Sequence, residues 1–176
     1  MSYIRTHTKR EFYPLAPDQE QIDIRDIAHA LSLLCRANGH FPHFYSVGQH
    51  CVACAVEAAA RGYSRRVQLA CLLHDASEAY LADVTRPVKK ELPKYLQIEA
   101  PLQNAIWAKW LRPALTEEEE KLVFLVDDAM LYYEFLGLMG EPIPGLPQDL
   151  VTAPDLSCAP FSTVEQKYLA LFEKLK

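Results

Sequence analysis

The chain has 176 residues, half of them apolar, and a formal net charge of −5 at pH 7. A chain of this length buries roughly two thirds of its unfolded surface, so we expect a single domain spanning 1–176. The even spread of apolar residues argues against disorder. The acidic balance argues against a protein that coats DNA or RNA, although a few local Arg and Lys side chains suffice to bind a small phosphorylated ligand.

The cysteine content predicts a cytoplasmic protein. There are five cysteines, an odd number, and the sequence offers no signal peptide and no long apolar span. This combination is typical of a reducing compartment and of a protein without a membrane segment. Cys51 and Cys54 form a C-x-x-C pair, but no second pair exists, and Cys54 shares a helical stripe with Val47 and Ala58. We therefore interpret these cysteines as small core residues.

Helical patterns dominate the chain, and we expect an all-α domain. Residues 3–24 carry the weakest pattern, which a short hairpin would fit. The apolar periodicity then predicts helices over about 26–38, 47–61, 64–81, 98–111, 116–138 and 162–175. Gly39, Gly62 and Gly140 follow three of these segments as stop signals. The core would occupy about 20–140, followed by a C-terminal segment and a final helix over 141–176.

Capping signals and prolines refine the later part of the chain. Thr116 and Glu119 match a capping box, and Ser162 and Glu165 match a second one. Residues 141–160 hold five of the twelve prolines, so we expect an irregular covering segment there. Pro87 and Pro93 mark a loop after the helix predicted over 64–81.

Residues 72–90, LLHDASEAYLADVTRPVKK, place ionisable groups directly after an apolar run. If the segments 47–61 and 64–81 form an antiparallel pair, His50 and His74 lie roughly 16 and 14 Å from the joined end. The two imidazoles are therefore expected to face each other. Asp75 is turned about 100° from His74, so both can reach one ion between the helices. Glu78 falls on the same side of this helix.

A matching anomaly occurs in LVFLVDDAML, where a charged pair interrupts an apolar run. Asp127 lies one turn from Val123 and Leu131, on a stripe where a lone carboxylate is costly. A metal ion would remove that cost, and the candidate ligands are then His50, His74, Asp75 and Asp127. Two imidazoles and two carboxylates suit Mn²⁺, Co²⁺, Fe²⁺, Ni²⁺ or Zn²⁺, with Mg²⁺ as an alternative. A buried His–Asp pair without a metal is the competing interpretation.

The order of these residues resembles the HD-domain superfamily of metal-dependent phosphohydrolases. The resemblance extends to HDASEAYLADVTRPVK, residues 74–89, and DIAHALSLLCRANGHFPHFYSVGQH, residues 26–50. Both blocks are similar to HD-type 5′-deoxynucleotidases and to their phage and prophage relatives, which include dATP triphosphohydrolases. The resemblance covers roughly residues 20–140 and implies an orthogonal bundle of α-helices. It also implies a bacterial cytoplasm or that of a phage-infected host.

The resemblance implies a role for each ionisable residue. His50, His74, Asp75 and Asp127 would bind one catalytic divalent metal. Glu78 and Asp83 would act on the attacking water and on the leaving oxygen. Glu134 lies two turns beyond Asp127 on the same face and is a candidate neighbour of the ligands. Gln49 stands where many relatives have Glu, but that position is not a ligand.

The substrate-binding candidates are basic residues around the same centre. Arg36, Arg86 and Lys89 would hold a phosphate, since guanidinium groups bind two oxygens at once. His43 would lie in the substrate pocket near Phe44 and Tyr45. For each of these residues, an ordinary solvated surface position is the alternative interpretation. His29 is interpreted as a core residue or a neighbour of the ligands.

We expect a metal-dependent phosphohydrolase that acts on small deoxynucleotides. It would release phosphate from a dNMP, as a 5′-nucleotidase, or triphosphate from a dNTP such as dATP, and the sequence does not separate these reactions. The alternative is a non-catalytic HD module that binds a nucleotide or a metal, which the intact set of acidic and histidine residues argues against. The relatives form dimers or larger assemblies, so we expect a homo-oligomer, with no nucleic acid polymer and no membrane as partner.

Overall fold

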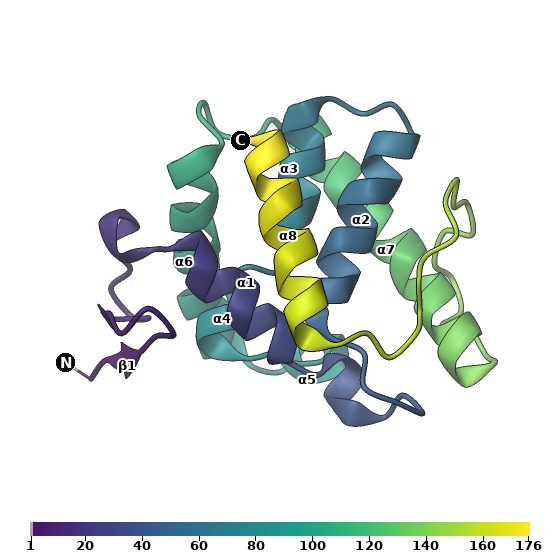
Figure 1. The fold of residues 1–176 in the computed structure, drawn as a ribbon, viewed down its shortest axis with the longest axis horizontal. Helices are drawn as coiled ribbons and strands as arrows, with labels where there is room; N and C mark the ends of the chain where they lie inside the picture. The colour runs from purple at the N-terminus through teal and green to yellow at the C-terminus, as the bar shows by residue number, and fades with distance from the viewer. Residues whose placement is uncertain (1) are drawn as a thin grey trace.

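The computed structural model describes residues 2–176 and is built mainly of helices. Five helices pack together in the bundle shown in Figure 1: α1 (Ile24–Leu33), α2 (Val47–Ala60), α3 (Arg65–Leu73), α7 (Glu117–Met139) and α8 (Phe161–Leu175). α4 (Glu78–Leu81) and α5 (Arg86–Lys90) lead from α3 to α6 (Pro93–Trp110), which flanks the bundle. The expected mainly helical domain is confirmed. No helix in the described part of the chain is long and apolar enough to cross a membrane.

A small hairpin precedes the bundle. β1 (Ile4–Arg5) pairs antiparallel with β2 (Glu11–Phe12), as the weak pattern over 3–24 predicted. A 3-10 turn, η1 (Gln19–Gln21), then leads into α1. The side chain of Phe12 is fully buried, and its ring stacks on Tyr80 of α4. The hairpin is thereby anchored to the helical core.

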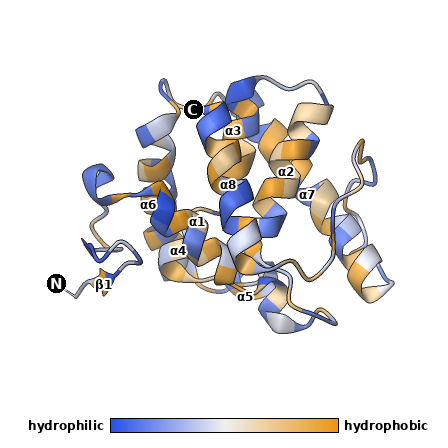
Figure 2. Cartoon of the chain, in the orientation of Figure 1, coloured by the Kyte–Doolittle hydropathy of each residue, from blue (hydrophilic) through white to orange (hydrophobic). Residues whose placement is uncertain are grey.

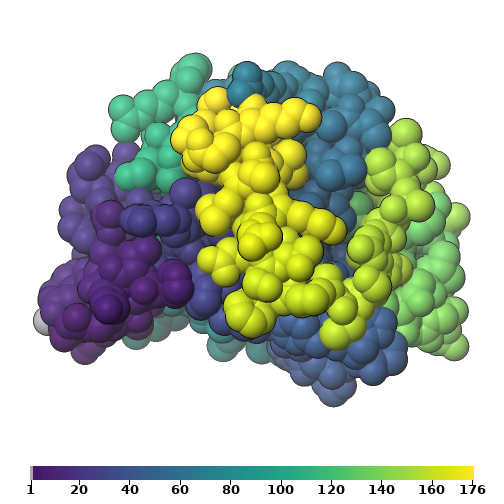
Figure 3. Space-filling view, viewed as in Figure 1, coloured from purple at the N-terminus to yellow at the C-terminus, as the bar shows by residue number. Residues whose placement is uncertain are grey.

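The core extends beyond residues 20–140. Val164, Tyr168 and Phe172 of α8 are buried, and the Tyr168 hydroxyl donates a hydrogen bond to the carbonyl of Leu72 at 2.7 Å. α8 packs against α1, α2 and α3, and Figure 3 shows it covering one face of the molecule together with the segment before it. These helices carry both hydrophobic and hydrophilic residues, as Figure 2 shows. The amphipathic pattern expected of the last helix therefore reflects core packing.

The predicted helix over 64–81 is interrupted between Leu73 and Glu78, the segment that contains His74 and Asp75. α3 ends at Leu73, His74 forms its C-cap, and α4 begins only at Glu78. Gln103 of α6 compensates the break: its side-chain nitrogen donates to the Leu73 carbonyl at 2.8 Å, and its oxygen accepts from the Ser77 amide at 3.0 Å. These bonds satisfy backbone groups that a helix end leaves free. The straight helix predicted from periodicity was therefore wrong here.

The predicted helix over 26–38 is also shorter than expected. α1 ends at Leu33, and a 3-10 turn, η2 (Arg36–Gly39), follows, in which Ala37 has a φ of 52°. The chain turns back because the Arg36 amide donates to the Tyr45 carbonyl and the Val47 amide to the Leu34 carbonyl, at 2.9 and 3.0 Å. This turn directs Arg36 into the protein.

The helix starts were predicted with mixed success. The capping box of Thr116 and Glu119 is present at α7. At α8 the N-cap is Pro160, without a side-chain cap bond, so the second capping box was wrong. Glu165 instead accepts from His29, with 3.2 Å between Oε2 and Nδ1. α6 begins at Pro93 rather than near residue 98, because proline suits the first turn of a helix.

Candidate metal centre

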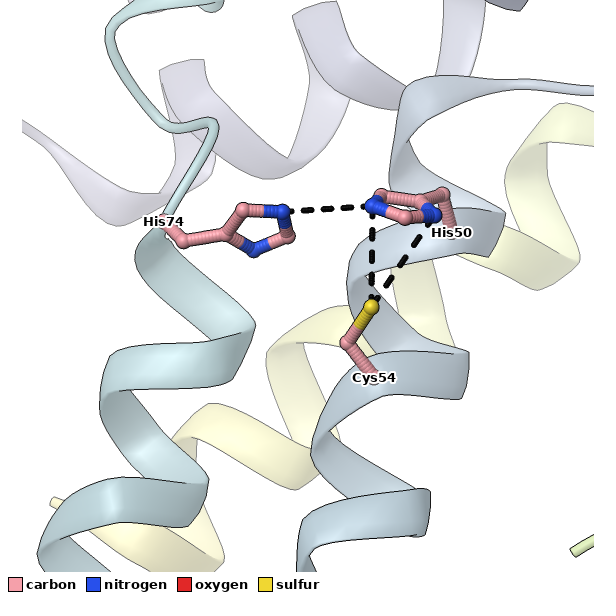
Figure 4. A group of neighbouring side chains, drawn as sticks. All are labelled: His50, Cys54 and His74. Carbon is pink, nitrogen blue, oxygen red and sulfur yellow. Dashed lines mark hydrogen bonds between the residues drawn. The ribbon is translucent and has the colours of Figure 1, made fainter. Parts of the chain in front are cut away.

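Two imidazoles face each other at the centre of the bundle. His50 lies in the first turn of α2, which a capping box of Ser46 and Gln49 starts, and His74 lies at the end of α3. Their Nε2 atoms are 3.2 Å apart, as the close-up in Figure 4 shows. The antiparallel pairing of these two segments therefore brings the histidines together as expected.

Two carboxylates complete this group. Oδ1 of Asp127 lies 3.0 Å from Nε2 of His50 and 3.6 Å from Nε2 of His74. Oδ2 of Asp75 lies 3.3 Å from Nε2 of His74 and 3.8 Å from Nε2 of His50. Atoms bound to one ion at about 2.1 Å lie about 3.0 Å apart at right angles and about 3.4 Å apart in a tetrahedron. The observed spacings match such a shared ion.

Both imidazoles are oriented by a bond from the other ring nitrogen. Nδ1 of His74 donates to the carbonyl of Cys71 at 2.7 Å, and Nδ1 of His50 lies 2.7 Å from Oε1 of Glu134. These bonds leave both Nε2 atoms directed at each other and at two carboxylates, where a bound proton or a metal ion would offset the negative charge. Burial lowers the pKa of His74, but Asp75 and Asp127 outweigh it and raise that pKa well above its usual value.

Arg36 and Glu134 form a buried ion pair behind the ligands. Nε of Arg36 donates to Oε2 of Glu134 at 2.8 Å, and both side chains are almost inaccessible to solvent. The guanidinium also lies 3.6 Å from Asp75 and 3.9 Å from Asp127. Burial raises the pKa of Glu134, but Arg36 and His50 lower it below its usual value, so Glu134 is an ionised acceptor for His50. The expectation that Glu134 neighbours the ligands is confirmed.

A cavity of about 910 Å³ opens beside this group. Eight residues singled out from the sequence line it: Arg36, His74, Asp75, Glu78, Asp83, Arg86, Lys89 and Asp127. Apolar side chains of α6 and α7, including Trp107, Phe124 and Phe135, form much of the remaining wall. Such a mixture of apolar wall and a few polar groups is typical of a small-molecule site.

Glu78 and Asp83 provide two carboxyl groups within the same cavity. Glu78 is 5% exposed, and its Oε2 has no hydrogen-bond partner within the described residues. Burial, together with the Asp75 and Asp83 carboxylates, raises the pKa of Glu78 well above its usual value. Burial also raises the pKa of Asp83. Carboxyl groups with a raised pKa are suited to proton transfer near neutral pH.

The basic candidates from α5 are already paired. Nη2 of Arg86 donates to Oδ2 of Asp127 at 2.6 Å, and its Nη1 donates to Asp128. Nζ of Lys89 lies 2.8 Å from Glu99 and 3.5 Å from Glu78. Both side chains line the cavity, and their charges balance the carboxylates that they contact.

Two histidines lie elsewhere than expected. His43 is exposed and does not line the cavity; its Nε2 lies 2.8 Å from the carbonyl of Leu156, because the segment 141–160 folds over this loop. His40 lines the cavity in its place. The ring of His29 stacks on His7 at 3.7 Å, which places it at the hairpin side of α8. The pocket role expected of His43 is therefore not supported by its position.

The thiols of Cys51, near His74 and Asp75, and of Cys54, near His50 and His74, are further candidate ligands, and Cys54 contacts His50 directly. Its Sγ lies 3.5 Å from Nε2 and 3.9 Å from Nδ1 of His50 (Figure 4), and within 4.8 Å of His74. Burial and the nearby Asp127 raise the pKa of Cys54 well above its usual value, so it is a neutral thiol. Contact with both ring nitrogens means that the sulfur lies beside the ring rather than along the Nε2 lone pair. Cys54 is a core residue, as the sequence predicted.

Two residues of this region carried no clear sequence signal. Gln103 hydrogen-bonds the backbone on both sides of the break between α3 and α4, but in the sequence it is only one of several polar residues along α6. Asp128 directly follows the candidate ligand Asp127 and accepts a hydrogen bond from Arg86. The double acid in an apolar run was the one hint of its role.

Comparison with known proteins identifies relatives but no described activity. No family model matches the chain. An uncharacterized protein of Rhodobacter capsulatus is 37% identical over 107 residues, which are 57% of this chain and 54% of that protein. The uncharacterized protein YfdR of Escherichia coli strain K12 is 36% identical over 126 residues, which are 72% of this chain and 68% of YfdR. The chain belongs to the same protein family as YfdR.

Proposed function

We propose that the protein is a metal-dependent phosphohydrolase of the HD-domain superfamily that acts on small deoxynucleotides. The observation that carries this proposal is the convergence of Asp75 and Asp127 on the facing imidazoles of His50 and His74: one oxygen of each carboxylate lies 3.0 to 3.8 Å from both Nε2 atoms, which are 3.2 Å apart. The substrate class rests on the resemblance of the segments 26–50 and 74–89 to deoxynucleotidases. The proposed fold is the orthogonal helical bundle of that superfamily.

The ligand set fits a borderline divalent ion such as Mn²⁺, Co²⁺, Fe²⁺, Ni²⁺ or Zn²⁺. When bound, such an ion polarises a phosphoryl oxygen and lowers the pKa of a bound water. Glu134 and the Cys71 carbonyl hold the two imidazoles in the ligating tautomer. Arg36 compensates part of the negative charge of Asp75 and Asp127.

Different side chains would carry out proton transfer and substrate binding. Glu78, buried next to Asp75, is placed to orient the attacking water or to accept its proton. Asp83, on the loop after α4, is placed to protonate the leaving oxygen. Arg86 and Lys89 border the same space and can contact phosphate oxygens. The apolar wall from α6 and α7 offers a surface for the base and the sugar.

The first experiment is incubation with dAMP and with dATP in the presence of Mn²⁺ or Co²⁺, followed by phosphorus NMR. Phosphate released from dAMP alone identifies a 5′-nucleotidase. Triphosphate released from dATP identifies a triphosphohydrolase. No product from either nucleotide contradicts the proposed substrate class, and metal binding without turnover of any phosphoester would favour the non-catalytic HD module.

A further inference from the structure

We propose that Asp128 is a positioning residue for the metal centre, acting through Arg86 on the ligand Asp127. The inference rests on the metal centre of the proposed function. It assigns a role to the second acid of the Asp127–Asp128 pair and a new role to Arg86. In this arrangement the arginine holds a ligand carboxylate, and Asp128 holds the arginine.

The two oxygens of Asp127 have different partners. Oδ1 is directed at Nε2 of His50, 3.0 Å away, while Oδ2 accepts a hydrogen bond from Nη2 of Arg86 at 2.6 Å. A carboxylate bonded on one oxygen cannot rotate freely about its last bond. Arg86 therefore presents Oδ1 of Asp127 toward the imidazoles as a single ligand atom.

Arg86 by itself would be a weak constraint. Its side chain is 47% exposed, and a long exposed side chain loses much conformational freedom when one ion pair fixes it. Asp128 supplies the second contact, because its Oδ1 accepts from Nη1 of the same guanidinium. Two bonds from different nitrogens of a planar guanidinium, one to each carboxylate, fix its orientation as well as its position.

The sequence spacing makes this bridge possible. Asp127 and Asp128 are neighbours on α7, about 100° apart around the axis, so one carboxylate faces the histidines and the next faces α5. Within residues 2–176, Arg86 is the cation that pairs with Asp128, and no ion pair joins Asp128 to His50 or His74. Asp128 therefore acts from outside the ligand set, linking α7 to the N-terminal turn of α5.

The bridge also compensates charge. Asp75, Asp127 and Asp128 bring three carboxylates to one side of the cavity, together with Glu78 and Asp83. The Arg86 guanidinium lies between two of them. Loss of the contact with Asp128 frees Arg86 to move away from Asp127, and the ligand carboxylate then loses both its orientation and its counter-charge.

The test is metal binding by the full chain, with Asp128→Asn as the main variant and Arg86→Lys as the second. Metal-free protein is titrated with Mn²⁺ in a calorimeter, and the visible absorption of the Co²⁺-loaded protein reports the coordination geometry. Both variants should bind Mn²⁺ roughly 10- to 100-fold more weakly and change the Co²⁺ spectrum, the usual effect of removing a residue that orients a ligand. Glu118→Gln, an exposed acid on the same helix, is the matched control and should change neither.

The outcomes separate this inference from the proposed function. Wild-type protein that binds neither ion contradicts the metal centre, and with it both proposals. Wild-type binding with unchanged affinity and spectrum in both variants overturns the role of Asp128 and leaves the metal centre intact. Thermal unfolding of the metal-free proteins, followed by circular dichroism, must give equal midpoints for wild type and variants, since a weakened fold would imitate the expected loss.

Discussion

Nδ1 of His50 lies 2.7 Å from Oε1 of Glu134, and both side chains are fully buried. The two residues lie 84 positions apart in the chain, so this contact forms only because α2 and α7 pack together. Glu134 binds Arg36 with its other oxygen, so one carboxylate connects a ligand to the cation behind the site. We therefore expect Glu134 to control the orientation of His50 and the charge of the centre.

Replacing Glu134 with Gln should weaken Mn²⁺ binding roughly 10- to 100-fold, because the amide is a poorer acceptor for the His50 N–H. The variant also leaves Arg36 without its buried partner, so some loss of thermal stability is expected. Calorimetric titration with Mn²⁺ measures the first effect. Equal affinity in Glu134→Gln and wild type would contradict a role in orienting His50.

Replacing Asp75 with Ala should abolish turnover and metal retention without unfolding the chain. Asp75 contributes one of the four converging ligand atoms, and its nearest partner is His74 at 3.3 Å. Metal content by atomic emission, the circular dichroism spectrum and phosphate release are measured together. Unchanged activity would disprove the assignment of this site.

Glu78→Gln and Asp83→Asn should each lower kcat by about 10²- to 10⁴-fold, the usual contribution of a proton-transfer group. Metal affinity should stay within a few-fold of wild type, since neither residue belongs to the ligand set. Initial rates with dAMP and dATP, paired with Mn²⁺ titration, separate the two effects. A large loss of metal binding in Glu78→Gln would instead identify Glu78 as a ligand.

The stability of α1 should depend on pH through Asp23. Its side chain caps the helix at the Arg25 amide, and hydrogen bonds from Arg25 lower the pKa of Asp23 to about 2. The folded pKa is below the unfolded value, so the stabilisation is present above about pH 4 and is lost as the pH falls toward 2. Asp23→Ala should cost about 1–2 kcal/mol near pH 7.

Asp23→Asn provides the matched control, because asparagine still caps the helix but carries no charge. Urea unfolding from pH 7 down to about pH 3 should show a smaller loss of stability in Asp23→Asn than in wild type. Parallel pH profiles for the two proteins would mean that Asp23 contributes through its cap bond alone.

The resemblance to HD-type enzymes predicts that the protein forms a dimer or a larger homo-oligomer. Apolar side chains of α7 that do not line the cavity are also exposed, among them Leu125 at 40% and Leu136 at 39%. Exposed apolar groups along one helix are a common feature of interfaces. Size-exclusion chromatography with light scattering measures the mass, and a value corresponding to one chain would refute this expectation.

The sequence by itself located the longer helical segments, but not all of their ends, and it identified the candidate ligands. Apolar periodicity located the long segments, and the antiparallel pairing of 47–61 with 64–81 by itself predicts that His50 lies opposite His74. Asp127 was identifiable because a carboxylate in an apolar stripe is costly without a partner. These signals are local, and local patterns reflect helix geometry directly.

Only the tertiary structure decided how the site is assembled around those ligands. The break after Leu73 depends on Gln103, which lies 30 residues away in the chain, and the orientation of His50 depends on Glu134, 84 residues away. The position of His43 depends on Leu156 in the segment that folds over it. Hydrogen bonds between distant segments have no periodicity in the sequence, because they arise only when packed helices bring those segments together.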